Sequence, residues 1–199
     1  MKFLITTSLL LFILTCTYAQ KHTLDDISLS KSDFEIKEGI TNHPYDAKIY
    51  TEVSYEYRIE EDKGKPILHV KAKLSINSDK SWIKEEFWSN ASDKAKADLL
   101  AHEKGHLLVS LIHFKELENL WRQSIFSKQQ CKLELRRAYK NIDSIGDSMN
   151  SAYDDETNHS RIREKQEEWI TSLMNRINEL YAEEEKISFS FQIKTPISE

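Results

Sequence analysis

One short stretch, Lys96–Ile112, limits what this chain can fold into more than any other. It reads KADLLAHEKGHLLVSLI and contains His102, Glu103 and His106 in the pattern HExxH. Leucines stand on both sides of the pattern at helical spacing, which predicts that it lies in the middle of a largely buried helix. Side chains four residues apart on a helix lie one above the other, about 6 Å along the axis, so both imidazoles can face one point.

This pattern is typical of zinc hydrolases. Two histidines hold the ion, and Glu103, rotated by roughly 100° from His102, lies near enough to take a proton from water. The structural alternative is two polar core residues and a surface Glu on an ordinary helix. Two His and a Glu without partners on a buried helix are costly, and this cost favours a metal site with His102 and His106 as ligands.

A catalytic zinc ion usually has three protein ligands and one open position, so another ligand is needed. His113 lies seven residues past His106, about 10 Å farther along the same helix, which is too far for bonds of about 2 Å. The metzincin pattern HExxHxxGxxH is excluded, because Val109 and Ile112 occupy the corresponding positions. Three later acids are candidates that read more simply as solvated helix residues: Glu116, Glu118 and Glu134.

His159 is the other candidate for the third ligand. It lies in the polar segment Tyr153–Ser160, which we expect to be a loop after a helix over 128–149, since Gly146 and its acidic neighbours weaken that helix. Ser160 would cap the next helix, so His159 would stand at a rigid helix entrance. On spacing alone, an exposed loop His is an equally good interpretation.

The rest of the chain predicts an α+β fold. Residues 49–59 and 68–76 alternate apolar and polar side chains, and Glu60–Pro66 supplies a turn, so they form an antiparallel hairpin. A last alternating strand, 187–193, joins this hairpin. Ser92 is a good N-cap for the HExxH helix. We expect a small antiparallel sheet packed on three or four helices, zincin-like, with HExxH on the central helix.

Composition and the first residues define the domain organisation. The chain has 199 residues, 39% hydrophobic and 31% charged, with 4 Gly and 3 Pro, which suits a single helix-rich domain over 20–199. Residues 1–19 have the basic start, short apolar run and small residues of a secretory signal peptide, cut after Ala19. A lipid anchor on Cys16 fits less well, because Thr15 is a poor residue before a modified Cys.

Charge and hydropathy narrow the partners and the compartment. The net charge is −5 and the basic residues are scattered, so nothing indicates nucleic-acid binding. After the signal, no segment is apolar enough to cross a bilayer, and we expect an exported protein, periplasmic or extracellular. Removal of the signal leaves Cys131 alone, and a lone Cys is most simply a buried small hydrophobe.

The motifs together resemble a bacterial family of predicted secreted zinc-dependent proteases, otherwise described as a domain of unknown function. The resemblance rests on the run LLAHEKGH and on a Ser-Trp-Ile segment and hairpin before it. It rests also on YDDETNHS, followed by Gln166 and Trp169. It covers roughly Ile49–Leu180. Ser160 and Leu107 replace residues frequent in the family, and neither is a proposed ligand.

The resemblance implies His102 and His106 as ligands, Glu103 as base and His159 as third ligand. Because the activity of the family is itself inferred from its motif, the resemblance supports a site better than a substrate.

We therefore expect a secreted zinc-dependent peptidase that acts on peptides or proteins with Zn²⁺ as cofactor. Glu103 is the expected general base, and Tyr153 is a candidate donor to the oxyanion. Asp154 or Asp155 would orient a ligand imidazole. The hairpin offers an edge strand along which an extended peptide can pair. Two alternatives stay open: a catalytically inactive zinc-binding envelope protein that acts as a binding module, and a helical envelope-associated structural protein without metal.

Overall fold

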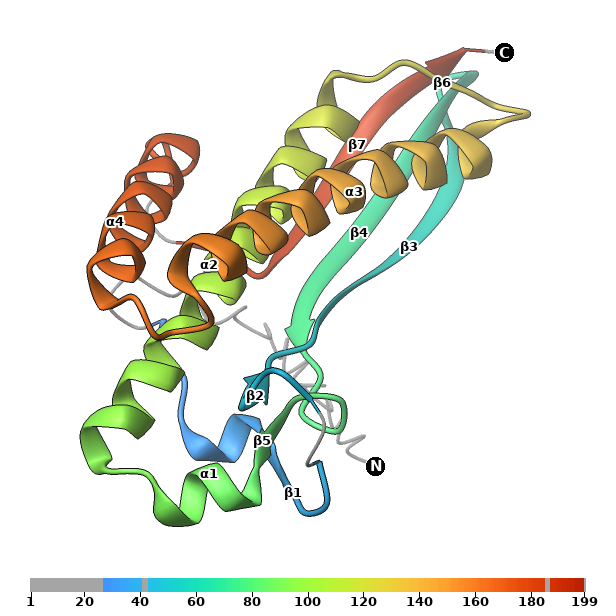
Figure 1. Ribbon diagram of the computed structural model, residues 1–199. Coiled ribbons are helices and arrows are strands. Elements are labelled where there is room, and N and C mark those ends of the chain that lie inside the picture. The colour runs from blue at the N-terminus through green and yellow to red at the C-terminus, as the bar shows by residue number, and fades with distance from the viewer. Residues whose placement is uncertain (1–26, 41–42, 185–186, 199) are drawn as a thin grey trace, which may run out of the picture.

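A long helix, α2 (Asp93–Gln123), crosses the middle of the fold and contacts elements from both the helical and the strand layers (Figure 1). The computed structural model describes residues 27–40, 43–184 and 187–198 and confirms the α+β class, with four helices in this part of the chain. The expected signal peptide, including Cys16, lies outside the described residues. No helix within the described ranges is long and apolar enough to span a membrane.

The larger sheet contains the expected hairpin. Its first two strands pair antiparallel in one continuous register from Thr51 opposite Ile76 to Asp62 opposite Lys65. The hairpin turn is shorter than expected: only Lys63 and Gly64 connect the strands, with φ of 52° and 77°, as in a type I′ turn. The sheet has the order β3-β4-β7-β6, with β3 (Thr51–Asp62), β4 (Lys65–Ile76), β7 (Ser190–Ser198) and β6 (Phe126–Ser127).

The C-terminal strand joins the hairpin as expected. β7 pairs antiparallel with β4, whereas the short β6 pairs parallel with β7, so the sheet is mixed rather than purely antiparallel. Alternate residues of β4 and β7 are buried, which confirms the period-two pattern. Phe191 of β7 packs against two rings of α2, with centroid distances of 4.9 Å to Phe114 and 5.8 Å to Trp121. These contacts fix the sheet on the central helix.

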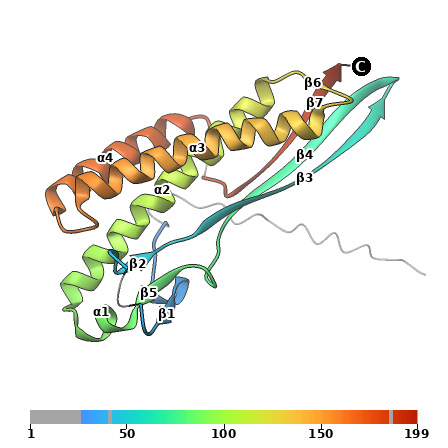
Figure 2. The same ribbon diagram turned by 45° about the vertical axis from the view of Figure 1, so that its right-hand side comes forward.

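A second, three-stranded sheet lies beside the first half of α2 and was not expected from the sequence (Figure 2). Its order is β1-β5-β2, with β1 parallel and β2 antiparallel to β5. The buried Ile83 and Trp82 belong to β5, so the Ser-Trp-Ile segment before the HExxH helix packs in the core. The elements are β1 (Glu35–Lys37), β2 (Ala47–Lys48), β5 (Trp82–Lys84) and α1 (Glu85–Asn90).

The helices correct one prediction. Ser92 caps α2 as expected, with its Oγ accepting from Ala95 N at 3.2 Å. However, α3 (Cys131–Thr157) continues through Gly146 and through most of the segment expected to be a loop. A Cβ on Gly146 would lie 3.0 Å from His113 Nδ1, so this glycine permits close contact between α3 and α2 rather than ending a helix.

The connection between α3 and α4 is also different from the expected one. α4 (Arg163–Leu180) has Ile162 as its N-cap residue, and Ser160 does not cap it. Three consecutive non-glycine residues in the connection have positive φ: 46° at Asn158, 51° at His159 and 73° at Ser160. L-residues adopt this region at a cost of about 1–2 kcal/mol each, so packing against the neighbouring elements must hold the turn in place.

Gly105 in the HExxH motif has a clear packing role. The ring of Tyr153 from α3 approaches this glycine closely. A Cβ on Gly105 would lie only 2.4 Å from the ring atom Cζ of this buried tyrosine. The α2–α3 contact at the motif therefore requires glycine.

Replacement of Gly105 by Ala tests this packing. Helix propensity alone would stabilise Gly105→Ala by about 1 kcal/mol. Because the added methyl group meets a rigid ring, we expect a net destabilisation of about 1–3 kcal/mol in urea unfolding. Ala101→Gly, at an exposed position of the same helix, measures the propensity effect by itself. A more stable Gly105→Ala protein would show that the ring of Tyr153 does not approach this glycine.

Candidate metal centre

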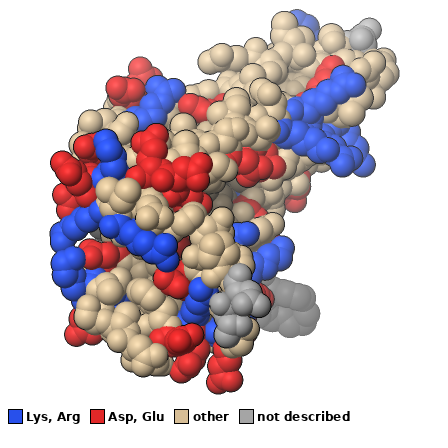
Figure 3. All heavy atoms as spheres, in the orientation of Figure 1, with Lys and Arg blue, Asp and Glu red and all other residues tan. Residues whose placement is uncertain are grey.

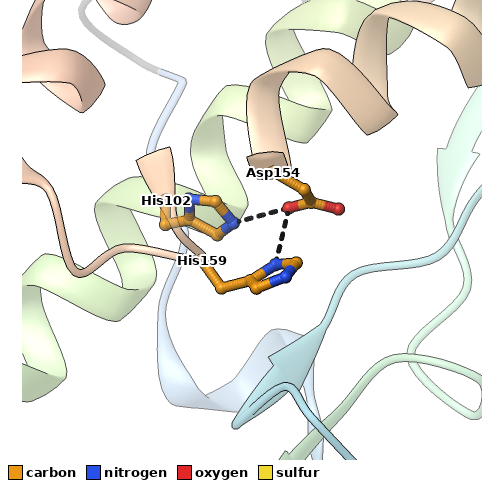
Figure 4. Close-up of side chains that lie close together, drawn as sticks. All are labelled: His102, Asp154 and His159. Carbon is orange, nitrogen blue, oxygen red and sulfur yellow. Dashed lines mark hydrogen bonds and ion pairs between the residues drawn. The ribbon is translucent and has the colours of Figure 1, made fainter. Parts of the chain in front are cut away.

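The two histidines of the HExxH motif meet the last turns of α3 at one point. Figure 4 shows His102 of α2 beside Asp154 of α3 and His159. His102 Nε2 and His106 Nε2 each lie 3.0 Å from Asp154 Oδ1. The two Nε2 atoms lie 3.3 Å from each other. One carboxylate oxygen and two imidazole nitrogens from two helices thus face a common centre.

His159 joins this group from the strained turn after α3. Its Nδ1 lies 3.3 Å from Asp154 Oδ1, and the ligand atoms of His102, Asp154 and His159 all lie within 4.8 Å of one another. The ring of Tyr45 packs on the His159 ring at a centroid distance of 4.2 Å. The structure therefore brings the three expected ligands together and adds Asp154, which we expected only to orient an imidazole.

Hydrogen bonds on the far side of each ring orient the two motif histidines. His106 Nδ1 lies 2.9 Å from Asn150 Oδ1, an acceptor, so the N–H of this ring is on Nδ1. His102 Nδ1 lies 3.4 Å from Thr157 Oγ1, whose own proton goes to the carbonyl of Tyr153 at 2.6 Å. Both rings thereby present Nε2 to the centre, an arrangement typical of metal-binding histidines.

The facing atoms in this centre require a positive charge between them. A neutral imidazole with its proton on Nδ1 presents a lone pair at Nε2, and the Asp154 carboxylate presents only lone pairs. Such acceptors repel one another at 3.0–3.3 Å unless a proton or a metal ion lies among them. Ligands about 2.1 Å from a tetrahedral zinc ion stand roughly 3.4 Å apart, close to the separations among His102, His106 and Asp154 and to the distance from Asp154 to His159.

The pKa shifts in the centre have the same cause. Burial acts to raise the pKa of Asp154, but His102 and His106 in their protonated forms donate to this carboxylate and attract its charge, which holds the pKa far below its usual value. Burial acts to lower the pKa of His106, but the hydrogen bond to Asp154 and the charge of Glu103 raise it. In addition, α3 has no basic residue in its last turn to offset the carboxylate there. The centre attracts a cation.

Glu103 lines a cavity between α2 and the start of the hairpin, and the donors of the centre line the same cavity. The cavity has a volume of about 350 Å³ and is also lined by Tyr45, His102, His106 and Asp154. Glu103 is buried, and its Oε2 accepts a hydrogen bond from the backbone N–H of Ile49 at 2.7 Å. Oε1 has no hydrogen-bond partner among the described residues. One carboxylate oxygen is thus anchored and the other is available.

Tyr153 lies outside the cavity, in contrast to the role expected for it. Its side chain is fully buried, and its hydroxyl donates to the carbonyl of His102 at 3.2 Å. The ring stacks on the His102 ring with a centroid distance of 4.7 Å, and burial strongly raises the pKa of the phenol. This geometry favours a positioning role for Tyr153, which fixes His102, over donation to an oxyanion.

The remaining candidates lie away from the centre. Glu118 binds Lys115 and Arg122, Glu116 pairs with Arg176, and Glu134 accepts from a backbone N–H. Cys131 is buried, as expected for a small hydrophobe. Sequence reasoning missed two residues that orient the rings, Asn150 and Thr157. Their spacing with Asp154, four and three residues along one helix, was the available signal, but it was hidden by the assumption of a loop.

A comparison with known sequences gives a family but no function. Residues 17–160 match a family described as "Bacterial protein of unknown function (DUF922)". The matched range contains Glu103 and all four residues of the centre and ends before α4. No curated protein and no solved structure matches the chain. The match confirms the expected bacterial family of unknown function and carries no information on zinc or proteolysis.

Metal titration tests three of the four donors. We expect the purified protein to bind one equivalent of Zn²⁺, and His102→Ala, Asp154→Ala and His159→Ala each to weaken binding at least 10-fold, because each loses one ligand. His69→Ala, which removes a histidine on the outer part of the hairpin that pairs with Glu60, should bind zinc as the original protein does. Unchanged zinc affinity in Asp154→Ala or His159→Ala would remove that residue from the ligand set.

Proposed function

The chain belongs to this bacterial family of unknown function, and we propose that it is an exported zinc-dependent peptidase with Glu103 as general base. One observation carries the proposal. The Nε2 atoms of His102 and His106, each ring oriented by a hydrogen bond at Nδ1, converge with the carboxylate of Asp154. Beside them lies Glu103, of which one carboxylate oxygen has no hydrogen-bond partner among the described residues. Such a set of donors around a cavity fits metal-assisted hydrolysis better than it fits a structural core.

The donors suit zinc. Imidazole nitrogen and carboxylate oxygen are usual zinc ligands, and His102, His106, Asp154 and His159 would hold the ion. When bound, zinc supplies a Lewis acid that polarises a carbonyl group and acidifies water. Four donors are one more than most catalytic zinc ions have, so hydrolysis requires either a fifth coordination position or release of one donor.

The chain itself supplies the proton transfer. Glu103 Oε1 takes a proton from the attacking water and delivers it to the leaving amine, while Oε2 stays on the N–H of Ile49. This anchor keeps the carboxylate on the cavity wall throughout. The phenol of Tyr45, which lines the cavity next to His159, is the tyrosine placed to meet substrate, whereas Tyr153 keeps His102 in position.

The alternative, a catalytically inactive zinc-binding envelope protein, has one observation in its favour. A full set of four protein donors is typical of structural zinc sites, which have no open position. A closed structural site does not require a carboxylate oxygen without a hydrogen-bond partner in the cavity, whereas a general base does. Oε1 of Glu103, unpaired among the described residues, therefore supports the peptidase function.

Exchange of Glu103 for Gln separates the two functions. The amide oxygen of Glu103→Gln still accepts from Ile49, so the fold and the zinc content should stay the same. Without a base, hydrolysis of an unfolded protein such as casein should fall about 10²–10⁴-fold. Glu116→Gln, on the same helix but paired with Arg176 outside the cavity, should cleave normally.

Equal cleavage by the original protein and Glu103→Gln would contradict the role of Glu103. Zinc binding without any hydrolysis by the original protein would favour the binding module.

A further inference from the structure

The metal cavity continues into a second hollow along α3. This second cavity has a volume of about 370 Å³. Six residues line both cavities, so the two form one groove between the start of the hairpin and α3. The shared residues are Lys48, Ile49, Thr51, Ser110, Asp147 and Asn150.

One face of α3 forms a wall of the groove. Tyr139, Asp143, Asp147 and Asn150 follow one another at helical spacing and line the second cavity, and Asp154 continues the row into the metal centre. The opposite wall is the start of β3, which is an edge strand. The floor is apolar and is formed by Val53, Leu74, Phe114, Leu117 and Ile142.

Two carboxylates in this wall have no cationic partner. Among the described residues, no Lys or Arg lies within ion-pair distance of Asp143 or Asp147. The third acid of the second cavity, Glu52, is already engaged, since it accepts from Asn77 and lies 3.9 Å from Lys80. Figure 3 shows acidic side chains over the middle of this face, where α3 passes, and basic ones at the upper right, near the hairpin tip.

The carboxylates of Asp143 and Asp147 repel each other. Burial and the charge of Asp147 raise the pKa of Asp143, although Tyr139 and His113 act in the opposite direction. Lys48, the one basic residue that lines this cavity, lies at its shared end. A cation placed between Asp143 and Asp147 would remove the repulsion.

A buried histidine in the same cavity has one ring nitrogen without a partner, which points independently to a ligand. His113 lines the cavity and is only 7% exposed, yet its Nε2 has no hydrogen-bond partner in the part of the chain that the structure describes. Burial lowers the pKa of this imidazole, which favours the neutral form. A buried polar atom without a partner costs about 1–3 kcal/mol in proteins, so such atoms usually meet a partner in the functional state.

These groups do not form a second metal site. Among the described residues, the donors that lie close enough together for an ion belong to the metal centre already described: His102, Asp154 and His159, with His106 beside them. His113, Asp143 and Asp147 are spread more widely around an apolar floor. This spread suits a long organic cation, whose methylene groups pack on the floor while its charged head meets the carboxylates.

We propose that the groove formed by His113, Asp143 and Asp147 is a specificity subsite for a Lys or Arg side chain of the substrate, with Arg favoured. The subsite rests on the proposed function, since it assigns a substrate class to the same peptidase centre. A guanidinium group offers five N–H donors, enough for two carboxylates. Seven residues of helix, about 10 Å, separate Asp147 from Asp154. This distance equals about three residues of extended peptide, so the basic side chain lies within three residues of the reacting carbonyl.

Peptide binding tests the subsite without the need for turnover. Two blocked peptides that differ only in Arg or citrulline, which has the same shape but no charge, are titrated by calorimetry into zinc-loaded Glu103→Gln protein. We expect the Arg peptide to bind at least 10-fold more tightly. In Glu103→Gln that also carries Asp143→Asn and Asp147→Asn, the ratio should fall below about 2-fold, with the citrulline peptide unchanged.

A matched control removes the same charge elsewhere. Glu61→Gln with Asp62→Asn neutralises two exposed acids at the hairpin tip and should keep the full Arg preference. Zinc content and melting temperature confirm that each variant is folded.

The outcomes separate the subsite from the peptidase. Equal binding of both peptides, no binding of either, or an Arg preference that survives loss of both carboxylates overturns the subsite, whether or not casein is cleaved. An Arg preference that depends on Asp143 and Asp147 supports the subsite even if the original protein proves not to cleave casein.

Discussion

The structure depends on the contact between the lone pairs of His102, His106 and Asp154 where α2 meets α3. Distances of 3.0–3.3 Å between these acceptors are stable only around a positive charge. The surrounding structure is arranged to produce this contact and not to avoid it. Asn150 and Thr157 fix the protons of the two rings on Nδ1, and the ring of Tyr153 stacks on the ring of His102.

Several otherwise costly features follow from this contact. Gly105 gives up helix propensity so that Tyr153 can approach α2. Acidic residues occupy the last turn of α3, where the helix dipole disfavours them. The turn that carries His159 has three consecutive non-glycine residues with positive φ. Backbone strain of this kind is often found at functional sites, where the surrounding packing maintains it.

The sequence predicted the parts that depend on local periodicity. The hairpin, the strand that joins it, the capped HExxH helix and the approach of His159 to the motif all agree with the structure. Patterns of period two and 3.6 carry this information. The short strands β1 and β2 were missed, because three and two residues are too few to show a period.

The predicted end of α3 was wrong for a different reason. Residues 153–157 are polar, and polarity near Gly146 suggested a loop, but tertiary contacts decide here: the glycine faces His113 and Asp154 faces the metal centre. Propensity is a weak guide where a helix carries a site. The contact of Asp154 with the two motif histidines was hidden for the same reason, since only a continuous helix aligns Asp154 with Asn150.

X-ray absorption at the zinc edge of the loaded protein tests the central claim most directly. The account predicts a first shell of only nitrogen and oxygen at about 2.0–2.1 Å, with the outer-shell scattering of at least two imidazole rings. That scattering should be reduced when His106 is replaced by Ala. A shell with sulfur near 2.3 Å, or one without imidazole scattering, would contradict a metal centre at the crossing of α2 and α3.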